Sequence, residues 1–177
     1  MNSSHSSSHV CLVLGGASSG KSQLALNLAG HELPKAFLAT GEPGDEEMAG
    51  RIRKHQQGRD AMWDTKEIPL DVSGWLKSHG PEYKTVVIDC LTLWISNLLG
   101  CGMGSSQILS QTDELMRSAR MVPGAVVLVS NELGLGIVPG DSTTRQFREL
   151  AGKVNQRVAE MADAVYFTVS GLPMKLK

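Results

Sequence analysis

The sequence predicts a single α/β domain in which a mostly parallel central sheet is flanked by helices, and two observations predict it. Short aliphatic and β-branched runs recur from Val10 onward, each about the length of one strand. Segments with helical spacing separate these runs, which is the alternation expected when helices connect parallel strands. At 177 residues the chain is long enough to bury one core, and no internal repeat divides it. We therefore expect one domain over residues 10–177.

Residues 1–9 precede the first aliphatic run and are almost all serine, histidine and asparagine. Such a segment buries too little apolar surface to offset the entropy lost on ordering. We expect a disordered polar leader, and we give its histidines, His5 and His9, no functional role.

The clearest predicted helix covers about residues 144–162, because apolar residues recur along one of its faces at three- and four-residue steps. Basic residues occupy its other faces and indicate a solvated surface, although one near the helix start could reach a phosphate. The glycine-rich residues 99–106 are expected to form a loop. Strands are expected at 10–14, 36–40, 85–89, 125–130 and 164–169, and further helices at 21–29, 46–57 and 107–120.

Composition excludes several classes of protein. Seventeen basic and eighteen acidic residues give a net charge of −1, so no overall field attracts a nucleic acid or an anionic membrane. No apolar run approaches the roughly 18 residues that a membrane span needs, and the polar N-terminus lacks the apolar segment of a signal peptide. We expect a cytoplasmic protein. The three cysteines, Cys11, Cys90 and Cys101, are too few and too scattered for a disulfide framework or a cysteine metal site.

One stretch fits the pattern G-x-x-x-x-G-K-[ST] and lies between a predicted strand and a predicted helix. Its glycines let the backbone N–H groups turn toward a phosphate chain, and the following helix presents its positive end. Lys21 would place a charge on the terminal phosphates, and Ser22 would supply a hydroxyl to Mg²⁺. The pattern predicts a P-loop NTPase fold. The stretch consists of Gly15, Gly16, Ala17, Ser18, Ser19, Gly20, Lys21 and Ser22.

A carboxylate at the end of a buried strand usually completes such a site. The predicted strand at 85–89 ends in Asp89, at the sheet edge where ligands bind in open α/β folds. We interpret Asp89 as a ligand of Mg²⁺, directly or through water; a carboxylate that caps the next helix is the alternative. These motifs do not choose among kinases, ATPases, GTPases and transferases. The chain has no N-K-x-D element of the kind that switch GTPases use to read the base.

Further segments narrow the choice. They are residues 51–59 (RIRKHQQGR), residues 89–99 (DCLTLWISNLL) and a long C-terminal run that includes 129–139 (VSNELGLGIVP), 147–157 (FRELAGKVNQR) and 169–171 (VSG). Together with the glycine-rich stretch, and in the same order, they closely resemble the bifunctional adenosylcobinamide kinase and adenosylcobinamide-phosphate guanylyltransferase family. The likeness spans about Val10 to Lys177, nearly the whole chain.

The resemblance implies a two-step activity on adenosylcobinamide and its phosphate. The aminopropanol hydroxyl would be phosphorylated with ATP or GTP, and GMP would then pass from GTP to that phosphate, giving adenosylcobinamide-GDP and pyrophosphate. In this family the guanylyl group passes through a histidine, and His55 stands at the matching position. A neutral imidazole is a good nucleophile near pH 7, and its phosphoramidate is labile. From the residues alone, a histidine that interacts with a helix end is the alternative.

The resemblance also assigns catalytic, binding and assembly roles. His55 and Lys21 would be catalytic. Glu67 could equally be a solvated surface carboxylate, and Trp94 is expected in the core or a subunit interface. Asn131 and Glu132 follow the fourth predicted strand at the same carboxyl edge, and from that position we expect them to help shape the substrate side of the cleft. Family members form trimers with active sites near subunit contacts, so we expect a homotrimer. The nucleotide contacts beyond residues 15–22 would be Ala39, Thr40, Gly41, Gln56, Gln57, Gly58, Arg59, Glu67 and Asp89.

Two other interpretations stay open. One is a P-loop kinase of another small alcohol. The other is a noncatalytic nucleotide-binding subunit whose bound nucleotide only biases assembly.

Overall fold

The computed structural model describes residues 9–41 and 62–177, in which seven strands form one sheet in the order β3-β2-β4-β5-β1-β6-β7. Every neighbouring pair is parallel except β6 and β7, which form an antiparallel hairpin. The strands are β1 (His9–Gly15), β2 (Lys35–Ala39), β3 (Trp63–Glu67), β4 (Thr85–Asp89), β5 (Ala125–Asn131), β6 (Ala164–Val169) and β7 (Leu172–Lys175). The helices are α1 (Lys21–Leu28), α3 (Val72–His79), α4 (Leu91–Gly100), α5 (Ser105–Met121), α6 (Ser142–Met161) and the short 3₁₀ helix η1 (Gly80–Glu82).

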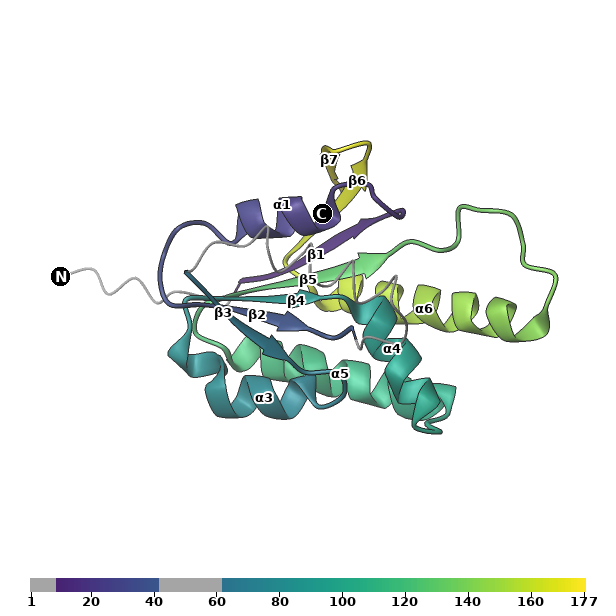
Figure 1. Ribbon diagram of the computed structural model, residues 1–177, viewed down its shortest axis with the longest axis horizontal. Helices are drawn as coiled ribbons and strands as arrows, with labels where there is room; N and C mark the ends of the chain where they lie inside the picture. Colours follow the sequence, from purple (N-terminus) through teal and green to yellow (C-terminus); the bar gives the residue numbers. More distant parts are fainter. Residues whose placement is uncertain (1–8, 42–61) are drawn as a thin grey trace.

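Helices cover both faces of the sheet (Figure 1). Helix α1 lies on one face, and α3, α4, α5 and α6 lie on the other. Successive residues of a strand point to opposite faces, so Leu12 of β1 packs toward the four-helix side and Val13 toward the α1 side. Burial on both faces explains why the central strands read as continuous apolar runs.

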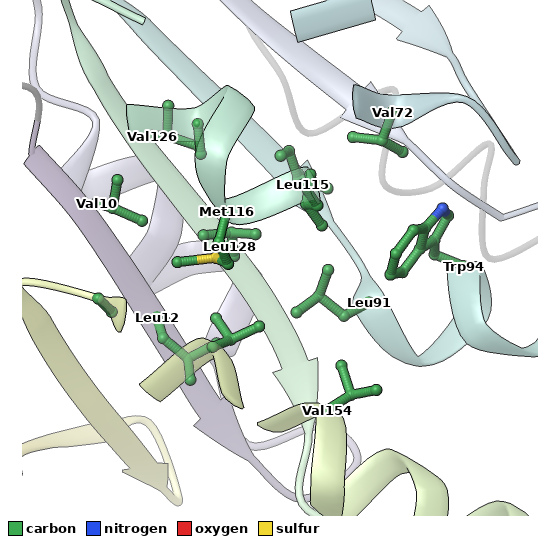
Figure 2. Packing of buried hydrophobic residues seen from close by; sticks show 14 of the residues in the cluster. Val10, Leu12, Val72, Leu91, Trp94, Leu115, Met116, Val126, Leu128 and Val154 are labelled. Carbon is green, nitrogen blue, oxygen red and sulfur yellow. The ribbon is translucent and has the colours of Figure 1, made fainter. Parts of the chain in front are cut away.

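The larger core lies between the sheet and α3, α4, α5 and α6 (Figure 2). Trp94 of α4 is fully buried there, and its indole N–H donates to the Leu70 carbonyl at 2.8 Å. Trp94 is expected from the sequence in the core or in a subunit interface, and the structure places it in the core. Burial of each large apolar side chain contributes roughly 1.5–3 kcal/mol. The residues labelled in Figure 2 are Val10, Leu12, Val72, Leu91, Trp94, Leu115, Met116, Val126, Leu128 and Val154.

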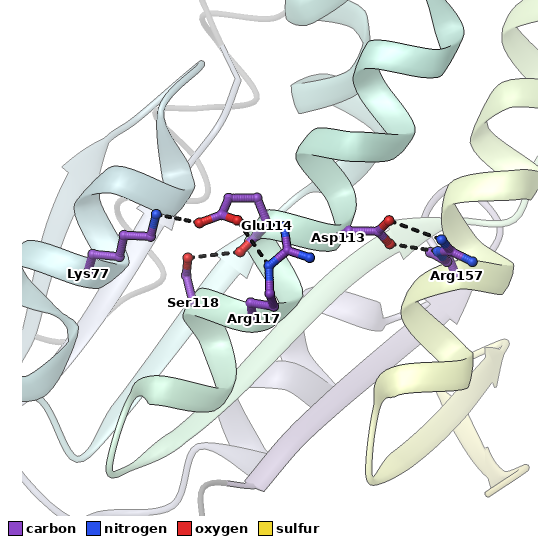
Figure 3. Close-up of polar contacts among 6 residues, drawn as sticks. All are labelled: Lys77, Asp113, Glu114, Arg117, Ser118 and Arg157. Atoms are coloured by element: carbon purple, nitrogen blue, oxygen red, sulfur yellow. Dashed lines mark hydrogen bonds and ion pairs between the residues drawn. The ribbon is translucent and has the colours of Figure 1, made fainter.

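Ion pairs join the outer surfaces of the helices on this face (Figure 3). Arg157 of α6 donates to both carboxylate oxygens of Asp113 on α5, at 2.6 and 3.0 Å, and holds the pKa of Asp113 below its usual range. Lys77 of α3 pairs with Glu114 of α5. Because these groups are half to one-quarter exposed to solvent, each pair contributes at most about 1 kcal/mol. The apolar core therefore stabilises this face far more than its ion pairs do.

The structure confirms the α/β fold class and all five predicted strands, with ends that shift by at most one residue. Helices α1, α5 and α6 are confirmed in the same way to within two residues. The predicted loop at 99–106 is wrong at both ends, because α4 continues to Gly100 and α5 begins at Ser105. Residues 1–8 and the predicted helix at 46–57 lie outside the described residues, and His9 is the first residue of β1 rather than part of a leader.

The sequence prediction contains no counterpart of β3, β7, α3 or η1, and it gives no bounds for the helix after Asp89, which is α4. Strand β3 is a sheet edge that reads Trp-Asp-Thr-Lys-Glu, and β7 is an edge strand of only four residues, Leu-Pro-Met-Lys, all of them exposed, so neither shows the longer aliphatic run of a central strand. Helix α3 has only eight residues and contains Gly74, whose N–H is capped by the Asp71 carboxylate at 2.9 Å. Within residues 9–41 and 62–177, no helix combines the length and the apolar character that crossing a membrane requires.

Candidate functional site

Strand register gathers the predicted site residues at the carboxyl edge of the sheet. Ala39 of β2 lies between Asp89 of β4 and Glu67 of β3, and Gly15 of β1 is level with Asn131 of β5. Parallel strands end at a common edge, and this is the edge at which open α/β folds bind ligands. The described part of the predicted site therefore occupies one side of the molecule.

Residues 15–22 connect β1 directly to α1, which confirms the predicted strand–loop–helix context. Gly20 precedes the first residue of α1 with φ 96°, a conformation that residues with a side chain rarely adopt. Because Gly20 has no side chain to cap the helix, the first backbone N–H groups of α1 are left for an anion. Gly16, Ala17 and Ser18 are exposed at the tip of the loop. We call residues 15–22 the P-loop from here on.

Lys21 folds back across the P-loop. Its side chain is buried, and Nζ donates to the Gly16 carbonyl at 2.5 Å. Burial lowers the pKa of Lys21 below its ordinary value, and the nearby Asp89 carboxylate partly opposes that shift. The ammonium group thus lies against the backbone that would hold a triphosphate.

The two predicted metal ligands meet where the P-loop enters α1. Ser22 Oγ donates to Asp89 Oδ2 at 2.6 Å, which joins the first turn of α1 to the end of β4. The alternative role for Asp89, capping α4, receives no support, because Cys90 is the capping residue and its side chain makes no capping hydrogen bond. Mg²⁺ takes few protein ligands and prefers oxygen, so a hydroxyl and a carboxylate suit it. Among the described residues, no cluster of three or more histidine, cysteine or acidic side chains offers another metal site.

Thr40 holds the chain just beyond Asp89. Its side chain is fully buried, and Oγ1 donates to the Cys90 carbonyl at 2.7 Å and accepts from the Cys90 N–H at 2.8 Å. Its own N–H donates to the Asp89 carbonyl at 3.1 Å, and its carbonyl accepts from Asn97 Nδ2 at 2.7 Å. These bonds occupy Thr40 with the backbone at the end of β4. In this structure Thr40 therefore supports Asp89 rather than presenting a hydroxyl to the cleft.

Glu67 is exposed at the end of β3, one strand beyond Ala39. The backbone continues along the same edge, because the Ile68 N–H donates to the Ala39 carbonyl at 2.8 Å. Two strand positions separate Glu67 from Asp89 in the sheet order. Ala39 is buried and Gly41 is half-buried, and β2 and β3 are separated from β1, the strand before the P-loop, by β4 and β5.

The end of β5 is tied to the P-loop. The Glu132 N–H donates to the Gly15 carbonyl at 3.0 Å, and the Asn131 N–H donates to Thr92 Oγ1 at 2.9 Å. The chain then runs through an extended loop, residues 132–141, that projects beyond the sheet before α6 begins (Figure 1). Arg145 donates to the carbonyls of Pro139 and Gly140 at 3.0 and 2.6 Å, so it binds this loop.

Two residues for which the sequence predicts no role, Thr168 and Gly171, lie against the P-loop. Thr168 of β6 is within 2.9 Å of Ser19 Oγ, and the Gly171 N–H donates to the Ser19 carbonyl at 2.9 Å. Nothing in the local sequence around Thr168 indicates this contact, because it depends on β6 lying next to β1. The predicted site residues His55, Gln56, Gln57, Gly58 and Arg59 all lie outside the described residues.

Comparison with known proteins decides the family. The family described as "Cobinamide kinase / cobinamide phosphate guanyltransferase" matches residues 11–176. The chain belongs to this family. The resemblance read from its motifs is thereby confirmed.

Curated members of the cobinamide kinase and guanyltransferase family match this chain along nearly its whole length. The bifunctional adenosylcobalamin biosynthesis protein CobP of Pseudomonas aeruginosa is 42% identical over 167 residues, which cover 94% of this chain and 96% of that protein. The CobU proteins of Salmonella typhimurium and Escherichia coli are each 36% identical over 178 residues, with 94% of this chain and 98% of theirs covered.

A solved structure supports the fold independently. The crystal structure of a KaiC-like protein from Pyrococcus horikoshii superposes with a TM-score of 0.53, covering 90% of this chain and 70% of that one. Only 14% of residues are identical, so the likeness concerns the fold alone. It agrees with the α/β fold that the sequence predicts.

Proposed function

We propose that this chain phosphorylates adenosylcobinamide and then transfers GMP from GTP to adenosylcobinamide phosphate, as the description of its family implies. The observation that carries the proposal is the match of residues 11–176 to the cobinamide kinase and cobinamide phosphate guanyltransferase family, and the 2.6 Å contact between Ser22 and Asp89 at the end of the P-loop supports it. A kinase and a nucleotidyltransferase both need a triphosphate held beside a metal, and this edge of the sheet brings together the residue types for that task.

In the kinase step the chain would act mainly by positioning and by charge. The P-loop N–H groups and the start of α1 would hold the triphosphate, and Lys21 would exchange its bond to Gly16 for a terminal phosphate oxygen. Ser22 and Asp89 are the residues that would hold Mg²⁺, directly or through water, and the bound ion would neutralise charge on the phosphate oxygens. The substrate hydroxyl would attack the γ-phosphorus and lose its proton as ADP or GDP leaves.

In the guanylyl step we propose His55 as the nucleophile. An imidazole nitrogen would attack the α-phosphorus of GTP and expel pyrophosphate, leaving GMP on the histidine. A phosphate oxygen of adenosylcobinamide phosphate would then attack the same phosphorus and restore the imidazole. This role rests on the match of residues 51–59 to the family motif. Gln56, Gln57, Gly58, Arg59 and Glu67 are proposed as further nucleotide contacts on the same ground.

Covalent labelling tests this proposal. The protein is incubated with GTP labelled at the α-phosphate, and protein-bound label is measured after denaturation and separation. We expect label in the native protein and none in His55→Ala, which should still phosphorylate adenosylcobinamide. His31→Ala is the matched control, because His31 is exposed in the loop after α1, at the opposite edge of the sheet. Lys21→Ala should lose both activities.

Other outcomes of the same experiment would redirect the assignment. Label that persists in His55→Ala would remove His55 from the mechanism. Phosphorylation of an alcohol without any protein-bound GMP would support a plain P-loop kinase. Nucleotide binding without turnover in the presence of adenosylcobinamide would support a noncatalytic subunit.

We further propose a homotrimer with active sites near subunit contacts, which the family resemblance implies, and a cytoplasmic location, where ATP and GTP are abundant. Sedimentation equilibrium should give three times the 19.0 kDa mass of one chain. A monomer that turns over adenosylcobinamide at the full rate would contradict the trimer, and activity confined to a membrane or secreted fraction would contradict the location.

A further inference from the structure

The turn between β6 and β7 lies directly against the P-loop. Ser170 and Gly171 form this turn with φ values of 50° and 79°, and Val169 pairs with Leu172 across it. Two successive residues with positive φ are typical of a two-residue hairpin turn, because the twist of such a turn matches the right-handed twist of the strands it joins. The hairpin therefore ends in a compact and well-defined corner.

The Thr168 hydroxyl, just before this turn, reaches two segments around the P-loop. Its Oγ1 donates to the Leu14 carbonyl at 3.0 Å and lies 2.9 Å from Ser19 Oγ. A threonine hydroxyl has one proton, so Ser19 must be the donor in the second bond. Both side chains are buried. The Ser19 hydroxyl thus points toward Thr168 on β6 and is occupied within the protein.

Backbone contacts complete the arrangement. The Gly171 N–H donates to the Ser19 carbonyl at 2.9 Å. A Cβ on Gly20 would stand 3.1 Å from Gly171 Cα, and a Cβ on Gly15 would stand 2.5 Å from Thr168 Oγ1. The second distance is impossible for a real side chain, so the first glycine of the P-loop is needed for contact with β6 as well as for the turn itself.

We propose that Thr168 and the Ser170–Gly171 turn form a brace that fixes the P-loop before a nucleotide binds, with Thr168 as a positioning residue. The inference rests on the proposed nucleotide site. Gly16, Ala17 and Ser18 at the loop tip are exposed, and the brace holds the loop at Ser19, immediately after them. A loop that is already ordered loses less conformational freedom on binding. The benefit is equal in the ground state and the transition state, so it appears in nucleotide affinity and KM rather than in kcat.

Substitution of Thr168 tests the brace. Thr168→Val keeps the shape and removes the hydroxyl, and we expect GTP affinity by calorimetric titration to fall about tenfold with kcat changed less than about threefold. Thr168→Ser should recover most of the lost affinity. Thr112→Val is the matched control, because Thr112 is also fully buried and its hydroxyl donates to the Ile108 carbonyl at 2.8 Å within α5. It should lower the melting temperature without changing GTP affinity.

A double-mutant cycle sharpens the test. If Ser19 acts through Thr168, Ser19→Ala should weaken GTP binding about as much as Thr168→Val, and the double variant should be no weaker than either. Additive losses would mean that the Ser19 hydroxyl touches the nucleotide directly, and the brace would be refuted. Thr168→Val with native GTP affinity would refute it too. In either case, loss of GTP binding in Lys21→Ala would still support the proposed nucleotide site. A native protein that binds no GTP would instead refute the proposed function.

Discussion

Ser22 and Asp89 are joined by a 2.6 Å hydrogen bond although 67 residues separate them in the chain. The contact fixes the start of α1 relative to the end of β4, at the sheet edge that also carries Gly15, Ala39 and Asn131. A metal held there would be tied to two separate elements of the domain.

Loss of either oxygen should weaken the response to Mg²⁺. We expect Ser22→Ala and Asp89→Asn to raise the Mg²⁺ concentration for half-maximal activity by about ten- to a hundredfold, because each removes an oxygen that would contact the ion or its water. Ser22→Thr keeps the hydroxyl and should stay close to native. Ser78→Ala, at an exposed serine of α3, is the control. An unchanged Mg²⁺ titration in Ser22→Ala and Asp89→Asn would contradict the assignment.

Thr40 should matter for stability and, through Asp89, for activity. Thr40→Val leaves the Cys90 N–H and carbonyl without the partner that now binds both, which should cost about 1–3 kcal/mol in the free energy of unfolding. Urea unfolding measures this cost, and a parallel assay should show reduced turnover. Thr85→Val is the matched control, because Thr85 is buried at the opposite end of β4 and its hydroxyl donates to the Ala29 carbonyl at 3.1 Å. Equal loss of turnover in both variants would show that Thr40 acts only on stability.

The cysteines should differ sharply in reactivity. Burial raises the pKa of both Cys11 and Cys90 to about 11, whereas Cys101 is exposed. At pH 8 a thiol with that pKa is ionised in only about one molecule in a thousand, and the thiolate is the reactive form. Native protein treated with iodoacetamide should therefore gain one label, at Cys101, and unfolded protein three. Rapid labelling of Cys90 in the native protein, seen by peptide mapping, would contradict the burial of Cys90 at the end of β4.

Tyr83 and Asp64 should give a stability contribution that depends on pH. The Tyr83 hydroxyl donates to Asp64 Oδ2 at 2.5 Å, which lowers the pKa of Asp64 and raises the pKa of Tyr83 to about 12. Because folding lowers the pKa of Asp64, its ionised form stabilises the fold above pH 3.8, and this contribution to stability is lost as the pH falls through the folded pKa. Because folding raises the pKa of Tyr83, its protonated form stabilises the fold below pH 10, and this contribution to stability is lost as the pH rises toward 12.

Tyr83→Phe should therefore be less stable than the native protein between about pH 4 and pH 10, by up to about 1 kcal/mol, with the difference shrinking outside that window. Denaturant unfolding at a series of pH values measures it, with Tyr166→Phe on β6 as the control. A difference that stays constant into strong alkali would show that the two groups are not coupled.

Local pattern was enough to predict the elements that carry phosphate chemistry. Residues 15–22 could be read because strand, loop and helix follow one another directly, and Asp89 because a buried strand ends there. Order within the sheet could not be read. The contacts of Ser19 with Thr168 and of Thr40 with Cys90 join residues 149 and 50 positions apart, and both require knowledge of which strands are neighbours.

Edges of the sheet escaped prediction for a different reason. Strand β3 has one sheet neighbour, β2, and ends in exposed Lys66 and Glu67, so apolar alternation is missing from it. The role of Glu67 was suggested only by family likeness, and the structure adds its place beside Ala39. His55 stays a prediction from likeness alone.

The loop at residues 132–141 bears on how the protein behaves in concentrated salt. Arg145 holds its backbone while Leu135, Ile137 and Val138 stand 79%, 96% and 62% exposed. Water must solvate these aliphatic groups, and sulfate makes that solvation less favourable. During ammonium sulfate fractionation, this projecting segment is a surface through which one chain would adhere to the next, so Ile137→Ser should delay precipitation.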